Sequence, residues 1–364
     1  MTTQSDLQAT LADAAQPPRF SDDARRLGIG IVGVGNIVRH AHLPAYAKHG
    51  FRVAAAYDVS AAAVAEAQAS FDLGRVHSSL DQLLDDPAVD VVDVATRPED
   101  RVEVMQAALR AGKHVLGQKP LATSLDAALD TVRLADAQGL KLAVNVNGRW
   151  APPWLTTTRL VEQGVIGPPL AVTHLYDASF AWTIGTHFND MAHFGLYDYS
   201  VHWLDIGLRW LRPARPEKIW AQESRLPIQP DDSHTPWEFD VRVQAESGLT
   251  LGIRAMCGSA NGQRSHPFTV HGAAGTIRGS VLEEGPLTLE ADGVQAEVTP
   301  EGTWFPDGFA GSMGELLTAI VEDREPDNSA RDGLITLEAV LGAVTSAESD
   351  GLAVPFTLPA AALH

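Results

Sequence analysis

The chain has 364 residues, which suggests two domains, and its 46 acidic against 27 basic side chains give a formal net charge of −19. An acidic excess of this size repels phosphate backbones, and no apolar run approaches the roughly 20 residues of a membrane span, so we expect neither a nucleic-acid nor a membrane partner. The single cysteine, Cys257, excludes an intrachain disulfide and fits a reducing cytoplasm.

The first 26 residues are polar, rich in alanine and interrupted by proline, and we interpret 1–26 as a flexible arm. Arg25-Arg26 then precedes an apolar run, which mimics a twin-arginine export signal. The run is short and no small-residue cleavage site follows it. We therefore interpret it as a buried strand and expect a cytoplasmic protein.

Residues 27–148 alternate short apolar runs with helical patterns. The runs are apolar on both faces, as buried parallel strands are. They lie at 28–33, 52–57, 89–95, 113–117 and 141–145. Amphipathic patterns at 98–112 and 124–139 predict helices, each closed by a glycine. The alternation predicts a doubly wound, Rossmann-type parallel sheet, hence an α/β domain that binds a dinucleotide.

Gly33-Val34-Gly35 stands between the first predicted strand and a helix. Glycines there allow a tight turn and the close approach of a pyrophosphate. Asp58 ends the second strand, where a carboxylate can accept hydrogen bonds from ribose hydroxyls and would repel a 2′-phosphate. We therefore prefer NAD to NADP. The alternative is a plain turn, with Asp58 capping a helix.

Gln118-Lys119-Pro120 follows the fourth predicted strand. In isolation Lys119 could be a surface cation. It stands, however, at the carboxyl edge of a parallel sheet, where ligands of such sheets bind.

Residues 149–364 follow another pattern and predict an α+β domain on a large, mostly antiparallel sheet. Residues 237–246 alternate apolar and polar side chains, Ser247-Gly248 forms a turn, and the alternation resumes at Leu249. This pattern indicates an antiparallel hairpin with one covered face. Two amphipathic helices, from about 313 and about 331, close the chain.

Residues 193–211 predict a largely buried helix that carries Asp198, His202 and Asp205 at i, i+4 and i+7. Titratable groups in such a helix are candidates for a site, and histidine suits proton transfer near neutral pH. A hydrogen-bonded core histidine is one alternative. A metal site is another and would need His187 or His193 as a further ligand; we predict no metal.

Together these features resemble the Gfo/Idh/MocA oxidoreductase family, which includes sugar and inositol dehydrogenases. The resemblance runs from about residue 28 to 350 and rests on "HLPAY", "GQKPLA", "GRWAPPW" and "LYDYSVHWLD". Gln118 stands where the family most often has glutamate, and Arg101 replaces a frequent histidine.

The resemblance implies that Lys119 hydrogen-bonds the reacting hydroxyl, that His202 is the acid/base and that Asp198 binds substrate and steadies His202. It also implies that the Lys119-Pro120 bond is cis. Besides Gly33, Gly35 and Asp58, we expect the cofactor to be lined by Asn36, Ile37, Thr96, Pro98, Gln118, Lys119 and Asn147. The candidates for substrate contacts are Arg149, Trp150, Trp182, His187 and Asn189, for each of which loop packing is an equal alternative.

The function implied is an NAD(P)-dependent dehydrogenase acting on a secondary alcohol of a sugar, inositol or related polyol. One alternative is a lyase or glycoside-cleaving enzyme whose bound NAD is recycled internally, and another is a non-catalytic NAD-binding protein. Relatives pair subunits through the second sheet, so we expect a homodimer or homotetramer.

Overall fold

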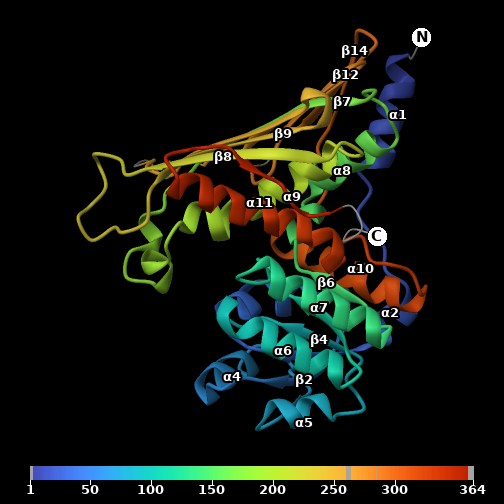
Figure 1. Cartoon of the computed structure of the whole chain (residues 1–364). Helices are drawn as coiled ribbons and strands as arrows, with labels where there is room; N and C mark the ends of the chain where they lie inside the picture. Colours follow the sequence, from blue (N-terminus) through green and yellow to red (C-terminus); the bar gives the residue numbers. More distant parts are fainter. Residues whose placement is uncertain (1–2, 260–263, 284, 360–364) are drawn as a thin grey trace. The chain divides into compact units, whose positions relative to one another are not determined.

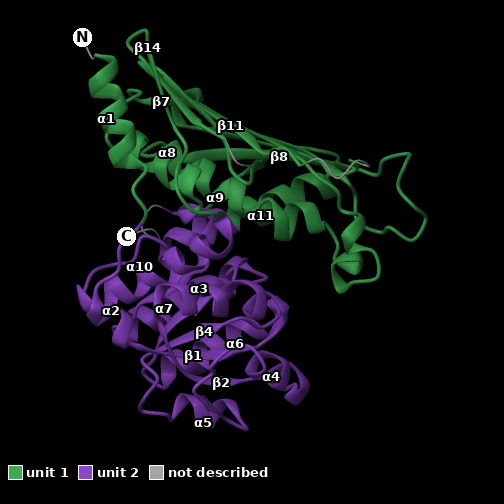
Figure 2. Cartoon of the chain, turned by 180° about the vertical axis from the view of Figure 1, so that it is seen from behind, with its two compact units in different colours: residues 1–17, 151–303, 338–358 green, residues 18–150, 304–337, 359–364 purple. Residues whose placement is uncertain are grey.

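The computed structural model describes residues 3–259, 264–283 and 285–359. The chain divides into two compact units (Figure 2). Unit 1 is drawn from residues 1–17, 151–303 and 338–358, and unit 2 from 18–150, 304–337 and 359–364.

Unit 2 contains a six-stranded sheet in the order β3-β2-β1-β4-β5-β6, with every neighbouring pair parallel. The strands are β1 (Gly28–Val32), β2 (Arg52–Tyr57), β3 (Arg75–Val76), β4 (Val91–Val94), β5 (His114–Gly117) and β6 (Leu142–Val144). The doubly wound prediction is therefore confirmed. Only β3 escaped prediction, because two exposed residues carry no periodic signal.

Helices cover both faces of this sheet. Figure 1 shows α6 (Pro98–Arg110) and α7 (Leu125–Gln138) in front of it, whereas Figure 2, from behind, shows α3 (Leu43–His49). Ser124 caps α7 by accepting a hydrogen bond from the Ala127 amide, and Gly139 ends it with a φ of 64°. The remaining α-helices between residues 18 and 150 are α2 (Asp22–Arg26), α4 (Ala61–Gln68) and α5 (Leu80–Leu84).

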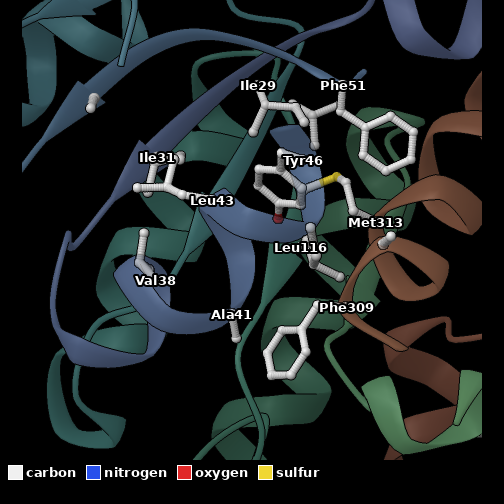
Figure 3. Packing of buried hydrophobic residues seen from close by; sticks show 14 of the residues in the cluster. Ile29, Ile31, Val38, Ala41, Leu43, Tyr46, Phe51, Leu116, Phe309 and Met313 are labelled. Atoms are coloured by element: carbon white, nitrogen blue, oxygen red, sulfur yellow. The ribbon is translucent and has the colours of Figure 1, made fainter. Parts of the chain in front are cut away.

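Residues 304–337 belong to unit 2, although the sequence assigned them to the C-terminal domain. In Figure 3, Phe309 and Met313 of α10 (Phe309–Val321) lie in one buried cluster with Ile29 of β1 and Tyr46 of α3. The Asn328 carbonyl also accepts a hydrogen bond from the Val144 amide of β6 at 2.8 Å. A parallel sheet needs apolar cover on both faces, and α10 provides part of it.

Unit 1 contains a nine-stranded sheet in the order β14-β13-β12-β11-β7-β10-β9-β8-β15. Only the β7–β10 pair is parallel among the described pairings, so the mostly antiparallel prediction is confirmed. The strands are β7 (Pro169–Asp177), β8 (Pro216–Ser224), β9 (Glu238–Ala245), β10 (Thr250–Met256), β11 (Pro267–Gly272), β12 (Gly275–Ser280), β13 (Leu287–Ala291), β14 (Val294–Val298) and β15 (Val354–Pro355).

Helices α8 (Pro152–Glu162) and α9 (Val201–Trp210) contact one face of this sheet (Figure 1). The long α11 (Ala330–Glu348) is shared, since the division into units falls after Leu337. The predicted hairpin is β9–β10, in which Val241 pairs with Ile253, and the turn residues Ser247 and Gly248 have φ of 60° and 79°. Two successive positive φ values match the twist of a hairpin.

Most of the described part of the expected flexible N-terminal arm is helical instead. Helix α1 (Gln4–Ala14) buries Leu7, Leu11 and Ala14 in unit 1, next to β13 and β14. The Gln8 side chain donates to the Glu297 carbonyl at 2.8 Å. The spacing i, i+4, i+7 puts the three buried residues on one helical face, a pattern that the polar composition obscured.

Among the described residues, no helix combines the length and the apolarity that crossing a bilayer requires.

Candidate active site

The turn after β1 is built for glycine. Gly33 has a φ of 89°, and a Cβ there would lie 2.8 Å from the Ala95 carbonyl oxygen. At Gly35, no described atom lies within 4 Å of an added Cβ. The turn therefore requires glycine at 33 and leaves open space at 35. Asn36 and Ile37 begin the helix there, so a pyrophosphate can approach its N-terminal amides.

Asp58 stands at the end of β2 and is tied to this turn. Its Oδ2 accepts a hydrogen bond from the Val34 amide at 2.6 Å, and its Oδ1 accepts one from the Ser60 amide at 2.7 Å. Each carboxylate oxygen has a further lone pair, so a ribose hydroxyl can still donate to it. The helix that follows is capped by Ser60, not by Asp58.

The helix after the turn continues as a π turn, Val38–His42, whose wide ring is closed by a hydrogen bond from the Leu43 amide to the Val38 carbonyl. Val38, which stands where the nucleotide pattern expects a small residue, is fully buried, and so is His42. π turns recur at functional sites. Here the turn carries an imidazole into the interior of unit 2.

His42 belongs to a buried polar network that the sequence analysis missed. Its Nδ1 lies 2.7 Å from Oδ2 of Asp93, which also accepts the Tyr46 hydroxyl at 2.7 Å. Its Nε2 lies 2.7 Å from Nε2 of Gln118 and 3.3 Å from Nδ2 of Asn145. The available signal was Asp93, a carboxylate in an otherwise apolar buried strand, which must find partners.

At the carboxyl edge of the sheet, Lys119 follows β5 directly and the Lys119-Pro120 bond is cis, as predicted. Buried Arg101 lies beside this segment: its guanidinium donates to the Thr96 carbonyl at 2.9 Å and to the Pro120 carbonyl. Arg101 thus joins the loop after β4, which holds Thr96 and Pro98, to the loop that holds Lys119. The structure brings these predicted cofactor residues to one edge of unit 2.

Other predicted residues of unit 2 are buried and engaged in packing. The Asn147 side chain accepts from the Trp304 indole at 2.7 Å and donates to the Asn145 carbonyl at 3.1 Å. Arg149 lies 2.7 Å from the Asp332 carboxylate, and a Cβ on Gly311 would collide with the Trp150 ring. These contacts are the ones expected of Asn147, Arg149 and Trp150 if their role is in packing.

In unit 1 the predicted 193–211 helix is divided. A π turn, Gly195–Tyr199, contains Asp198, and α9 begins at Val201 with His202 in its first turn. Both side chains are half-buried, whereas Asp205 is buried. Tyr199 stacks on Trp203 with ring centroids 5.5 Å apart and accepts a hydrogen bond from the Tyr176 hydroxyl. Burial raises the pKa of Tyr199 to about 12, so this phenol stays protonated beside Asp198.

The remaining substrate candidates lie in the loop between β7 and α9. Asn189 is engaged there, because it donates to the Asp232 carbonyl at 2.8 Å and accepts from the His234 amide at 3.0 Å. Trp182 remains 47% exposed while its edge contacts Phe188, and the exposed His187 lies against the same phenyl ring. Trp182 and His187 therefore keep surface that a ligand can reach.

The open turn, the carboxylate at the end of β2 and the lysine at the sheet edge define a Rossmann-type, dinucleotide-binding protein. Residues 27–146 match the family described as "Oxidoreductase family, NAD-binding Rossmann fold", GFO_IDH_MocA. The inositol 2-dehydrogenase 2 of Saccharopolyspora erythraea is 34% identical over 320 residues, which are 84% of this chain and 89% of that protein. The chain therefore belongs to the Gfo/Idh/MocA oxidoreductase family.

Two further comparisons concern another sequence relative and a solved structure. An uncharacterised protein of Saccharomyces cerevisiae is 33% identical over 152 residues, 41% of this chain and 43% of the yeast protein. An oxidoreductase from Agrobacterium radiobacter, whose crystal structure is in complex with NAD⁺, L-tartaric acid and magnesium, is 20% identical in sequence to this chain. It has a TM-score of 0.81 and covers 91% of this chain and 98% of its own, which shows a common fold.

Proposed function

We propose that the protein is an NAD-dependent dehydrogenase that oxidises or reduces one carbon of a sugar, inositol or related polyol. The observation that carries the proposal is the position of Lys119. It follows β5 at the carboxyl edge of the sheet, in the same unit as the open glycine turn. Ligands of parallel sheets bind at that edge.

The residues of unit 2 fit a dinucleotide. The amides at the start of the first helix can hold the pyrophosphate, and Asp58 can hold the adenosine ribose. The carboxylate would repel a 2′-phosphate, and Arg75, the first basic residue after it, is already paired with Asp86 at 2.8 Å. We therefore propose NAD rather than NADP. When bound, the nicotinamide exchanges a hydride with the reacting carbon.

Lys119, His202 and Asp198 supply the proton chemistry. The ammonium of Lys119 donates a hydrogen bond to the substrate oxygen and stabilises the negative charge that develops there. His202 removes the hydroxyl proton as a general base, and Asp198, four residues earlier, binds substrate and orients the imidazole. Lys119 belongs to unit 2 and the other two to unit 1, so their meeting around one substrate is part of the proposal.

Polyols are favoured by relatives named for inositol, and Trp182 and His187 offer an accessible indole and imidazole to a sugar ring. We propose that these two side chains, more than the engaged Arg149, Trp150 and Asn189, contact substrate. A cytoplasmic location remains our proposal.

A panel of sugars and polyols with NAD⁺ or NADP⁺, followed by absorbance of the reduced cofactor, tests the function. Net NADH release separates a dehydrogenase from an enzyme that recycles its NAD. On the best substrate, Lys119→Met and His202→Asn should each lower kcat by about 100-fold or more. Near-normal turnover of either folded variant would refute the assigned roles.

We also propose that copies of the chain associate through the exposed face of the unit 1 sheet. Arg254 there forms ion pairs with Glu238 at 3.2 Å and Asp240 at 3.9 Å, so the interface would be charged. Light scattering should detect a dimer or tetramer at micromolar concentration. A strictly monomeric protein would rule this out.

A further inference from the structure

We propose that His42 is a positioning residue for Lys119: as the neutral imidazole protonated at Nδ1, it holds the Gln118 amide so that Gln118 Oε1 accepts the Lys119 amide. This inference deepens the proposed function, because it rests on Lys119 being the group that binds the reacting oxygen. His42 lies in the π turn of the nucleotide-binding helix, and Gln118 directly follows β5.

The direction of each hydrogen bond follows from the neighbours. The Lys119 amide can only donate, and it lies 3.2 Å from Oε1 of Gln118. Gln118 must therefore turn its amide NH2 toward His42, at 2.7 Å from Nε2. An NH2 group only donates, so Nε2 of His42 carries the lone pair.

Asn145 leads to the same tautomer independently. The Asn147 amide donates to the carbonyl of Asn145 and lies 3.4 Å from its Oδ1. That contact makes Oδ1 the acceptor and leaves the Asn145 NH2 facing Nε2 of His42 at 3.3 Å. Two NH2 groups from two neighbouring strand ends thus converge on one ring nitrogen, which a proton on Nε2 would forbid.

Asp93 and Tyr46 complete the arrangement. With Nε2 unprotonated, the proton of a neutral ring is on Nδ1, which donates to Asp93 Oδ2 at 2.7 Å. Burial and the Asp93 charge raise the pKa of Tyr46, so its hydroxyl remains a donor to the same carboxylate. α10 contributes the ring of Phe309. The titratable groups that face His42 in the described contacts are therefore Asp93 and Tyr46.

Glutamine and glutamate at position 118 would give the buried network different charges. A glutamate there would place carboxylates on both sides of the buried imidazole. The ring would then gain a second proton at Nε2, because a buried carboxylate needs a donor. With Gln118 the network holds one carboxylate, that of Asp93, and the side chain before Lys119 carries no charge.

NMR of protein labelled with ¹⁵N-histidine tests the tautomer without any substrate. Gln118→Glu should identify His42 as the ring whose signals change. We expect a ring protonated at Nδ1 and not at Nε2 in the wild type, and a doubly protonated ring in Gln118→Glu. A doubly protonated or Nε2-protonated wild-type ring, or an unchanged ring in the variant, would overturn the proposal.

A double-mutant cycle tests the positioning. His42→Leu removes the acceptor and Gln118→Met removes both amide contacts, so each should lower kcat by about 10- to 100-fold. If His42 acts through Gln118, the double variant should be no slower than the worse single variant, whereas multiplied losses would contradict the proposal. If His42→Leu does not fold, the comparison of the wild-type and Gln118→Glu histidine NMR spectra decides the proposal. A wild type inactive on every alcohol would refute the proposed function and still leave the NMR test in force.

Discussion

At the scale of single residues, Asp58 has a structural role in addition to its proposed role in binding the cofactor. Both of its oxygens accept backbone amides, one from the glycine turn and one from its own loop. A neutral asparagine can accept at only one oxygen, so its NH2 group would face one of these amide donors. The charge of Asp58 therefore shapes the turn, and in the proposed function the same two atoms would repel a 2′-phosphate.

Asp58→Asn should raise the KM for NAD⁺ by about tenfold, the cost of about one charge-assisted hydrogen bond, and should narrow the preference over NADP⁺. Initial rates with both cofactors measure this. Asp72→Asn, which alters a carboxylate bonded to the Gly74 amide elsewhere in unit 2, is the matched control. An unchanged ratio of the two cofactors' kcat/KM values would show that Asp58 does not select NAD.

Arg101 is the second residue whose role depends on geometry. Its planar guanidinium reaches two carbonyls, of Thr96 and Pro120, that belong to loops after neighbouring strands. A lysine ammonium is a point donor on a flexible stem and does not reproduce that fork.

Arg101→Lys should destabilise unit 2 by about 1.5–3 kcal/mol, because it frees a buried carbonyl from a charged donor, and should lower kcat. Urea unfolding and steady-state kinetics test both effects. Arg110→Lys, on the exposed end of the same helix, should change neither. If the two variants have equal stability and equal kcat, Arg101 does not support the site.

At the scale of elements, the edge strand β3 is too short to hold itself in place. Asp86, 4% exposed, secures it by accepting hydrogen bonds from Arg75 at 2.8 Å and His77 at 3.0 Å, and from the Ala88 amide at 2.9 Å. The Ala88 amide, followed by His77 and Arg75, lowers the pKa of the Asp86 carboxyl below its usual 3.8. The edge of the sheet is thus held by side chains as well as by its ladder.

Because the folded-state pKa of Asp86 is depressed, its contribution is present above the unfolded pKa and is lost as pH falls through the folded one. Asp86→Asn should therefore lower the Tm at neutral pH, and its Tm should converge with that of the wild type below about pH 4. Thermal melts at several pH values measure this. A Tm difference that grows on acidification would contradict it.

At the scale of the whole molecule, one segment far along the chain completes the nucleotide-binding unit. Met313 and Phe309 of α10 are buried against side chains from β1 and α3, more than 250 residues earlier in sequence (Figure 3). The dinucleotide-binding unit is therefore not contiguous, and its stability depends on residues that follow β14 in the sequence.

Met313→Ala should destabilise unit 2 by about 2–5 kcal/mol through the cavity it leaves. Val321→Ala, at the 43% exposed end of the same helix, should cost far less. Chemical denaturation in which NAD⁺ binding is the measured signal reports on the stability of unit 2. Equal losses in the two variants would show that α10 does not form part of this core.

Local patterns in the sequence were enough for several elements. The runs apolar on both faces predicted five of the parallel strands, and the strict alternation around Ser247-Gly248 predicted the β9–β10 hairpin. The family motif placed Lys119 at the end of a strand. Each of these signals lies within a few residues, where backbone geometry and burial act directly on side-chain type.

Other features depend on partners that no local window contains. Leu7 and Leu11 needed the β13–β14 hairpin to bury them, and α10 needed the parallel sheet. His42, Asp93 and Gln118 come from three separate elements and become a network only when those elements meet. By itself the sequence determined the period of each element and the positions of the glycine turn and of Lys119, because these follow from local sterics. The tertiary structure alone decided which distant segments share a core and which tautomer His42 adopts, because burial and hydrogen-bond satisfaction are properties of the assembled chain.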